Sequence, residues 1–257
     1  MNFFTKYKPF YKENLRLAFP VILSQIGQIA VQLADTAMVG HYGGDDPTPL
    51  AAVSFATSFF YIIFISAMGL SFGLTPLVGE HYAKNHRTHV TELLQNGALL
   101  FALIGIVATI LLLVSRGLLT FMGGLMIEQG GDASIGAVIA TALPYYNTLI
   151  WSLFPIMIWC TAKQFLEGIG NTRLAMYTII TSNTLNIFLN WVLIFGNLGA
   201  PKMGVRGAAL ATVLSQAVGA VWILRFLTGK KSHLRLKLSN MKLQGRIIGP
   251  CLALGIS

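Results

Sequence analysis

The chain has 257 residues, of which 54% are hydrophobic and 11% are charged, and its mean hydropathy is +0.67. Soluble domains carry about 25% charged residues, so this composition excludes an ordinary soluble domain and indicates a polytopic membrane protein. The net charge of +9 is spread over short segments between apolar runs, which argues against a nucleic-acid partner and is typical of a topology signal.

Six apolar runs reach the roughly 20 residues that a membrane-spanning helix needs: residues 15–39, 50–77, 93–114, 135–160, 174–195 and 207–227. Residues 1–14 mix aromatic side chains with lysines, which favours a cytoplasmic segment at the membrane surface. Residues 229–246 form a basic linker, and residues 247–257 open a seventh apolar run too short to span. The sequence predicts an all-α membrane protein, with a six-helix bundle over residues 15–228 and the start of a seventh helix. We expect it to be the first half of a longer protein.

The basic residues predict the orientation of the chain. Placing the N-terminus inside puts 15 of the 18 lysines and arginines in inner segments, all except Arg116, Lys202 and Arg206. Inner loops of membrane proteins carry such an excess. The sequence therefore predicts a multi-pass protein of the plasma (inner) membrane with a cytoplasmic N-terminus and linker, and membrane lipids as partners.

Within the first run, Asp35 is the only charged residue between Leu17 and Val39. Spacings of 3, 4 and 3 place Gln25, Gln28, Gln32 and Asp35 on one helix face. A carboxylate in a membrane helix is costly and normally faces a bundle interior or a wet cavity. We interpret Asp35 as a functional carboxylate and the glutamines as a polar wall leading to it.

The fifth run carries a second polar stripe, made of Asn183, Asn186 and Asn190 at spacings of 3 and 4. Such amides need partners. They can serve as structural hydrogen bonds between helices, or they can offer oxygens to a cation and orient a carboxylic acid. With Asp35 available on another helix, we favour the second interpretation for Asn186 and Asn190, and we assign Asn183 to the same supporting polar wall as the three glutamines.

Two further runs carry polar or aromatic residues. In the sixth run, Thr212 is a candidate partner of the asparagines, whereas Ser215 is interpreted as a packing residue. In the fourth run, Tyr145 and Tyr146 are interpreted as part of an aromatic belt at the outer membrane surface.

Several classes of chemistry lack a motif in this chain. There is no P-loop, dinucleotide fingerprint, HExxH or GxSxG sequence, so we expect no enzyme activity and no cofactor. His81, His86 and His89 lie in a hydrophilic stretch at spacings of 5 and 3, and we interpret them as solvated residues rather than a metal site.

An ordered set of motifs covers all six runs and resembles the multidrug and toxic compound extrusion (MATE) transporters, most closely their NorM-like bacterial branch. The motifs lie at residues 19–25 (FPVILSQ), 35–40 (DTAMVG), 73–80 (GLTPLVGE), 165–173 (FLEGIGNTR), 186–196 (NIFLNWVLIFG) and 207–212 (GAALAT). The resemblance implies a twelve-helix transporter of two lobes, of which this chain would be the N-lobe. It also implies export of bulky, often cationic organic compounds in exchange for Na⁺ or H⁺.

The family's N-lobe cation site would map onto Asp35, Asn186, Asn190 and Thr212, with Na⁺ at Asp35 as the only metal expected. Some branches have a second aspartate where this sequence has Asn190, so the resemblance leaves the ion open. The expected partners are small organic substrates and the C-terminal lobe.

Two alternative functions are also compatible with the sequence. One is a lipid-linked oligosaccharide or polysaccharide flippase of the same superfamily, which would have a more cationic cavity; basic residues are expected to be absent from the spans, which favours drug export. The other is a fragment with no activity by itself.

Overall fold

The protein, as a computed structural model, is described over residues 3–128, 133–229 and 245–256. Every regular element in these ranges is helical: α1 (Phe3–Gly43), α2 (Thr48–Ser71), α3 (Leu74–Ala83), α4 (Arg87–Glu128), α5 (Ala133–Leu149), η1 (Ile150–Ser152), α6 (Leu153–Gly168), α7 (Thr172–Phe195), η2 (Asn197–Gly199), α8 (Val205–Thr228) and α9 (Gly245–Ile256). The expected all-α fold is confirmed. Most of the predicted basic linker, residues 230–244, lies outside the described residues.

The described helices include six segments long and apolar enough to cross a membrane, in agreement with the six predicted runs. They are Asn14–Gly43, Thr48–Ala83, Arg87–Leu125, Ser134–Gly168, Thr172–Phe195 and Val205–Thr228. Each extends beyond the predicted run at one or both ends, because helices continue past the apolar stretch into more polar sequence. The protein is a multi-pass membrane protein.

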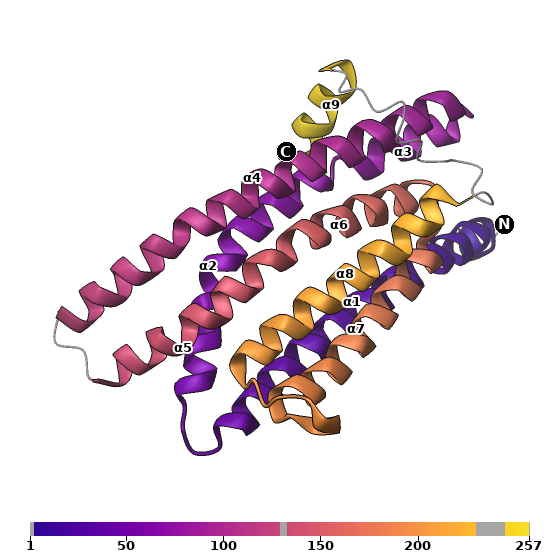
Figure 1. Cartoon of the computed structure of the whole chain (residues 1–257). Helices are drawn as coiled ribbons and strands as arrows, with labels where there is room; N and C mark the ends of the chain where they lie inside the picture. Colours follow the sequence, from indigo (N-terminus) through magenta and orange to yellow (C-terminus); the bar gives the residue numbers. More distant parts are fainter. Residues whose placement is uncertain (1–2, 129–132, 230–244, 257) are drawn as a thin grey trace.

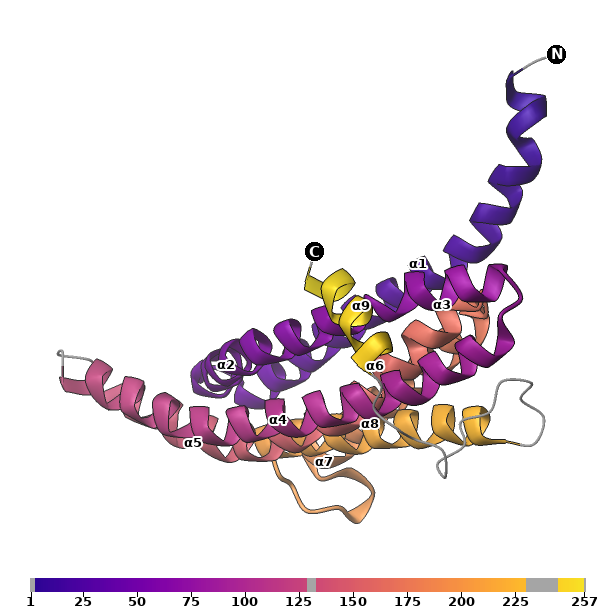
Figure 2. The ribbon, with the colours of Figure 1, turned by 90° about the horizontal axis from the view of Figure 1, so that it is seen from above.

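The long helices run side by side in an elongated bundle (Figure 1). The helices α1, α7 and α8 pack together on one side, and α2 and α4 pack with α5 and α6 on the other. The segments α6 and α5 also contact α8 and so join the two groups. The N-terminal part of α1 leans away from the bundle (Figure 2).

The second apolar run is interrupted, which the sequence did not indicate. The helix α2 ends at Ser71 and α3 begins at Leu74, with Gly73 between them. The short helix α9 packs at this break, and a Cβ atom on Gly73 would overlap the carbonyl oxygen of Cys251. A glycine is required here because the two backbones approach too closely for any side chain.

The fourth run is divided by a 3₁₀ turn, Ile150–Ser152, between α5 and α6. Pro155 has no backbone N–H to donate to the carbonyl of Trp151, and its ring crowds that carbonyl. The helix tightens at this point. The 3₁₀ turn therefore lies directly before the residue that cannot complete the α-helical hydrogen bond.

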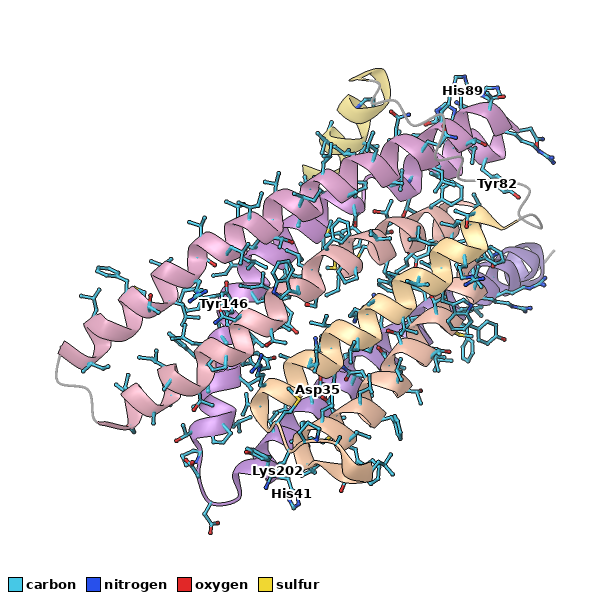
Figure 3. The ribbon with its side chains drawn as sticks, viewed as in Figure 1. Asp35, His41, Tyr82, His89, Tyr146 and Lys202 are labelled. Atoms are coloured by element: carbon cyan, nitrogen blue, oxygen red, sulfur yellow. The ribbon has the colours of Figure 1, made fainter. Side chains whose placement is uncertain are left out.

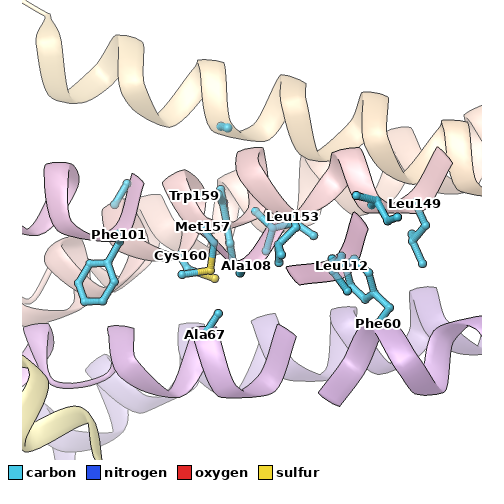
Figure 4. Packing of buried hydrophobic residues seen from close by; sticks show 14 of the residues in the cluster. Phe60, Ala67, Phe101, Ala108, Leu112, Leu149, Leu153, Met157, Trp159 and Cys160 are labelled. Carbon is cyan, nitrogen blue, oxygen red and sulfur yellow. The ribbon is translucent and has the colours of Figure 1, made fainter. Parts of the chain in front are cut away.

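A buried apolar cluster fills the space between α2, α4, α5 and α6 (Figure 4). Gly105 of α4 allows close approach here, since a Cβ atom on it would lie 3.1 Å from the Cβ of Met157. Tyr145 and Tyr146 belong to this cluster, with 6% and 0% of their surface exposed. The aromatic-belt interpretation is therefore wrong: Tyr146 points inward, and its hydroxyl lies 2.6 Å from the Ser115 hydroxyl of α4.

Candidate functional site

Asp35 lies on α1 where this helix packs against α7. In Figure 3 it is closer to the end of the bundle that carries His41 and Lys202 than to the end that carries Tyr82 and His89. Its side chain is partly buried, and Asn190 of α7 donates a hydrogen bond from Nδ2 to Asp35 Oδ1. A hydrogen bond to an ionised carboxylate is stronger than one between neutral groups, so this contact joins α1 to α7 through the charge.

The two asparagines of α7 continue the network. Asn190 Nδ2 also donates to Asn186 Oδ1 at 3.1 Å, and both residues are buried, with 0% and 4% exposure. A spacing of four residues places them one helical turn apart on the same face. Asn190 Oδ1 is buried without a hydrogen-bond partner among the described residues. An unpaired buried acceptor is costly, so the site keeps an oxygen free beside the carboxylate.

The helix α8 supplies the hydroxyl groups behind the asparagines. Asn186 Nδ2 donates to Thr212 Oγ1 at 3.4 Å and to Ser215 Oγ at 3.3 Å. Ser182 of α7 donates to the Ser215 backbone carbonyl at 2.7 Å. We call Asp35, Asn190, Asn186, Thr212 and Ser215 the Asp35 cluster.

The structure thus joins the four residues predicted to form the cation site into one hydrogen-bonded network across three helices. They are Asp35, Asn186, Asn190 and Thr212. Ser215 was interpreted from sequence as a packing residue, and its hydroxyl lies in this network instead. Ser215 follows Thr212 by three residues, and this spacing, which places both on one helix face, could have predicted its position.

The predicted glutamine wall is only partly connected to its surroundings. Gln32 donates from Nε2 to the Tyr61 hydroxyl of α2 at 3.2 Å. Gln25 is exposed and Gln28 is half-buried, and no hydrogen bond of either side chain is found within the described part of the chain. None of the three contacts Asp35 through a hydrogen bond, so they flank the cluster rather than belong to it.

Asn183 lies apart from the Asp35 cluster. Its Nδ2 faces Gly27 of α1, where a Cβ atom would be 3.5 Å away, and this nitrogen is buried without a partner in the described structure. Gly27 precedes Asp35 by eight residues, or about 12 Å along the helix axis. Asn183 therefore lies at the α1–α7 contact, about two turns from the carboxylate.

Lys163 corrects one expectation about charge. Basic residues were expected to be absent from the spans, yet Lys163 lies in α6 within the span Ser134–Gly168 and is only 8% exposed. Its Nζ is 3.6 Å from Glu167 Oε1, four residues later, and 5.8 Å from the centre of the Trp159 ring. Lys163 was assigned to a loop because it follows the apolar run, but the helix continues past it.

The three histidines gather at the α3–α4 connection. The ring of His81 lies 5.4 Å from that of His89 and 6.0 Å from that of His86. Within residues 3–128, 133–229 and 245–256, no group of three or more His, Cys, Asp or Glu side chains could hold a metal ion.

The Asp35 cluster has the chemistry of a small cation site. One carboxylate, one free amide oxygen and a fixed amide donor lie between three helices. A proton or a small cation at Asp35 would neutralise the negative charge of the carboxylate. The hydrogen bond from Asn190, which joins α1 to α7, would then be weaker.

Comparisons with known proteins agree with this architecture. A model of the MatE family matches residues 20–192. A protein described as "Probable multidrug resistance protein NorM" from Photorhabdus laumondii is 33% identical over 224 residues, which cover 87% of this chain and 47% of that protein. A protein of the same description from Thermotoga maritima is 30% identical over 226 residues, 88% of this chain and 46% of that protein. The chain spans about half the length of the curated relatives it matches.

Solved structures share the fold. One described as "Outward-facing conformation of a multidrug resistance MATE family transporter of the MOP superfamily" has a TM-score of 0.79 at 24% identity, over 95% of this chain and 51% of that one. Another, "Crystal structure of MATE in complex with MaD5", has a TM-score of 0.76 at 26% identity, over 95% of this chain and 52% of that one. From the family match, the relatives and this shared fold, the chain belongs to the MatE family.

Proposed function

We propose that this chain is one lobe of a secondary active transporter that exports bulky organic compounds, often cationic, in exchange for an inward-moving Na⁺ or H⁺. The observation that carries the proposal is the Asp35 cluster, a single carboxylate tied by amides between α1, α7 and α8. The printed names of the relatives, which refer to multidrug resistance, support the substrate class. The N-terminus lies in the cytoplasm and the lobe in the inner membrane, a proposal that rests on the distribution of basic residues.

In this mechanism Asp35 alternates between a charged and a neutralised state. A hydrogen bond to a charged acceptor contributes about 1.5–3 kcal/mol, against about 0.5–1.5 kcal/mol for a neutral one. Neutralising Asp35 therefore weakens its bond to Asn190 by roughly 1 kcal/mol, which is about a fivefold change in the balance between two helix arrangements. It also removes the cost of keeping a charge in a largely apolar bundle.

The cation can shift the balance between the two helix arrangements only because it binds one of them more tightly than the other. Asn190 and Asn186 orient the carboxylate, and Thr212 positions Asn186 from behind. Pro20 and Gly27 are the points at which α1 can bend, because a proline lacks the helical N–H and a glycine lacks side-chain packing. Release of the substrate on the outer side follows the change in α1.

The transport pathway requires a second lobe. Substrate sites of such transporters lie near the middle of the membrane at the contact between two structural repeats. Large apolar side chains on α1 and α2 are exposed in the described structure, among them Ile29, Leu33, Ile62 and Ile65. We propose that the C-terminal lobe, the substrate and membrane lipids share these faces, and that this lobe has no transport activity by itself.

The flippase alternative is less well supported. It would require a cationic cavity, and within the described spans Lys163 is the one basic side chain that is buried. Glu167 compensates this charge at 3.6 Å. A deletion strain separates the two functions, because loss of a flippase changes surface glycans whereas loss of an exporter raises the accumulation of dyes.

The proposal is tested by Asp35→Asn in the complete transporter, in cells that lack other efflux pumps. We expect ethidium efflux to be lost while the amount of protein in the membrane is unchanged. The matched control is Asp45→Asn, which removes an exposed carboxylate in the α1–α2 connection. Unchanged efflux by Asp35→Asn would overturn the proposal.

A further inference from the structure

The short helix α9 packs on the break between α2 and α3. It contacts α2, α3 and α4, and Figure 1 shows it beside α3 and α4, far from the α1–α2 connection. Cys251 of α9 is only 2% exposed and belongs to the buried apolar cluster of the bundle. The helix that follows the sixth spanning segment is therefore packed into the interior of this lobe.

The contact between α9 and the α2–α3 break is a contact between backbones. A Cβ atom on Gly73 would overlap the Cys251 carbonyl oxygen and would lie 2.8 Å from Gly255 N. A Cβ atom on Gly255 would lie 2.6 Å from the Leu70 carbonyl oxygen. Each side thus needs a glycine where the backbone of the other side touches it. We call Leu70, Gly73, Cys251 and Gly255 the glycine seat.

The helix α3 fixes one side of the glycine seat to the bundle. Thr75 of α3 donates from Oγ1 to Gln164 Oε1 of α6 at 2.6 Å. A Cβ atom on Gly168 of α6 would lie 2.8 Å from Val78 Cβ and 2.9 Å from the Thr75 carbonyl oxygen, so α3 and α6 also approach closely. Because α3 is held by α6, a separation at the glycine seat moves α9 away from α2 and α3.

The glycine seat lies in the part of the second span that leads to the α3–α4 connection, at the proposed cytoplasmic end. Under the proposed function, residues 247–257 begin the second lobe, so the seat is a contact between the two lobes. Transporters of this kind move one repeat against the other around a fixed substrate site. A contact between the lobes at the cytoplasmic end must therefore open before a compound can enter from the cytoplasm.

We propose that the glycine seat is the cytoplasmic gate of the transporter, closed in this structure and opened when α9 leaves the α2–α3 break. The proposal rests on the function proposed above, and it names the surface on which the second lobe closes. Two backbones in van der Waals contact leave no space between them for water or substrate. The closed seat therefore seals this side of the lobe against the cytoplasm.

The native thiol of Cys251 reports whether the gate is open. A buried cysteine is inert, and its rate of alkylation follows the fraction of time for which the surrounding contact is open. The test uses everted membrane vesicles that contain the complete transporter, treated with N-ethylmaleimide and analysed by mass spectrometry of the peptides. Cys160 of α6, which is 3% exposed, is the internal control for the fold. In wild type we expect Cys251 to react faster during ethidium uptake than at rest, and Cys160 to remain unmodified.

Two substitutions hold the gate open from opposite sides. Gly73→Ala and Gly255→Ala each place a Cβ atom against the backbone of the other helix. We expect either to raise the alkylation rate of Cys251 at rest on the order of tenfold, because the overlap shifts the population toward the open seat. Ethidium uptake should be lost, because the gate no longer closes.

Each side of the seat offers a matched control. Gly69→Ala on α2 and Gly249→Ala on α9 make the same substitution on the same helices, where a Cβ atom meets nothing within 4 Å. Both controls should keep wild-type ethidium uptake and an inert Cys251. A variant in which Cys160 also reacts has lost its fold, and the other alanine variant together with wild type during uptake then decides.

The outcomes separate the two proposals. Normal ethidium uptake by Asp35→Asn would show that the proposed function is wrong. If Asp35→Asn is inactive while Cys251 of wild type reacts equally fast at rest and during uptake, only the gate is wrong. Wild-type uptake by both Gly73→Ala and Gly255→Ala would overturn the gate in the same way. Faster alkylation of Cys251 during uptake, and in both alanine variants at rest, supports it.

Discussion

Replacing Asn190 by leucine tests how the charge on Asp35 is held. The substitution nearly conserves volume and removes two hydrogen bonds, one to Asp35 and one to Asn186. The first contributes about 1.5–3 kcal/mol and the second about 0.5–1.5 kcal/mol. The variant also removes the unpaired Asn190 Oδ1, whose burial costs about 1–3 kcal/mol. The relief offsets the losses only in part, because Asn186 Oδ1 and the Asp35 carboxylate are left without this donor, so we expect the free energy of unfolding to fall by about 2 kcal/mol.

The effect on proton binding has a definite sign. In Asn190→Leu the charged carboxylate loses its donor, whereas the neutralised carboxyl group loses less. A proton, which does not need the Asn190 oxygen as a ligand, should therefore bind Asp35 about fivefold more tightly, corresponding to roughly 1 kcal/mol.

The assay is thermal unfolding of the purified chain in detergent, followed while Na⁺ or pH is titrated, because a ligand of the folded state raises Tm. Asn197→Leu is the control, since Asn197 lies outside the cluster and bonds to the Trp191 carbonyl. A proton affinity equal to that of wild type in Asn190→Leu would refute the role of this hydrogen bond.

Three other substitutions follow from the contacts. Ser215→Ala removes an acceptor of Asn186 Nδ2 and should lower the free energy of unfolding by about 1 kcal/mol; in thermal unfolding, a loss no larger than that of the exposed Ser58→Ala would contradict this. Gly207→Ala places a Cβ atom 2.6 Å from the Leu193 carbonyl oxygen and should cost about 1–3 kcal/mol, whereas Gly117→Ala, with open space around it, should be neutral in the same assay. Asp46→Ala should lower Tm at neutral pH, because hydrogen bonds from the Thr48 side chain and backbone lower the pKa of Asp46 below its usual 3.8. This contribution is present above the unfolded-state pKa and is lost as pH falls through the folded-state pKa, so an equal difference in Tm at acid pH would contradict it.

Helical periodicity was sufficient to predict most of the Asp35 cluster. Asn186 and Asn190 are spaced for one face, and an isolated carboxylate such as Asp35 must find polar partners inside a bundle. These arguments depend only on local geometry and on the cost of burial. They therefore hold without knowledge of the packing.

The remaining features depend on tertiary neighbours that the sequence does not reveal. The sequence alone favours a belt position for Tyr146, because it does not reveal that the Ser115 hydroxyl of another helix lies beside the Tyr146 hydroxyl. Gly73, at the break between α2 and α3, must be a glycine because the backbone of α9 packs against it. Lys163 follows an apolar run and is predicted to lie in a loop, yet the helix continues and Glu167 compensates the charge. In each case the decisive partner is distant in sequence or beyond the predicted helix end.

The central claim is that a cation at Asp35 is coupled to movement of the substrate. Its most direct test is the cation flux that an imposed dye gradient drives across vesicles containing the complete transporter. Wild type and Asp45→Asn should both move cations against the direction of the dye, and Asp35→Asn should move none while it still binds the dye. A dye-driven cation flux of wild-type size in Asp35→Asn would contradict the account.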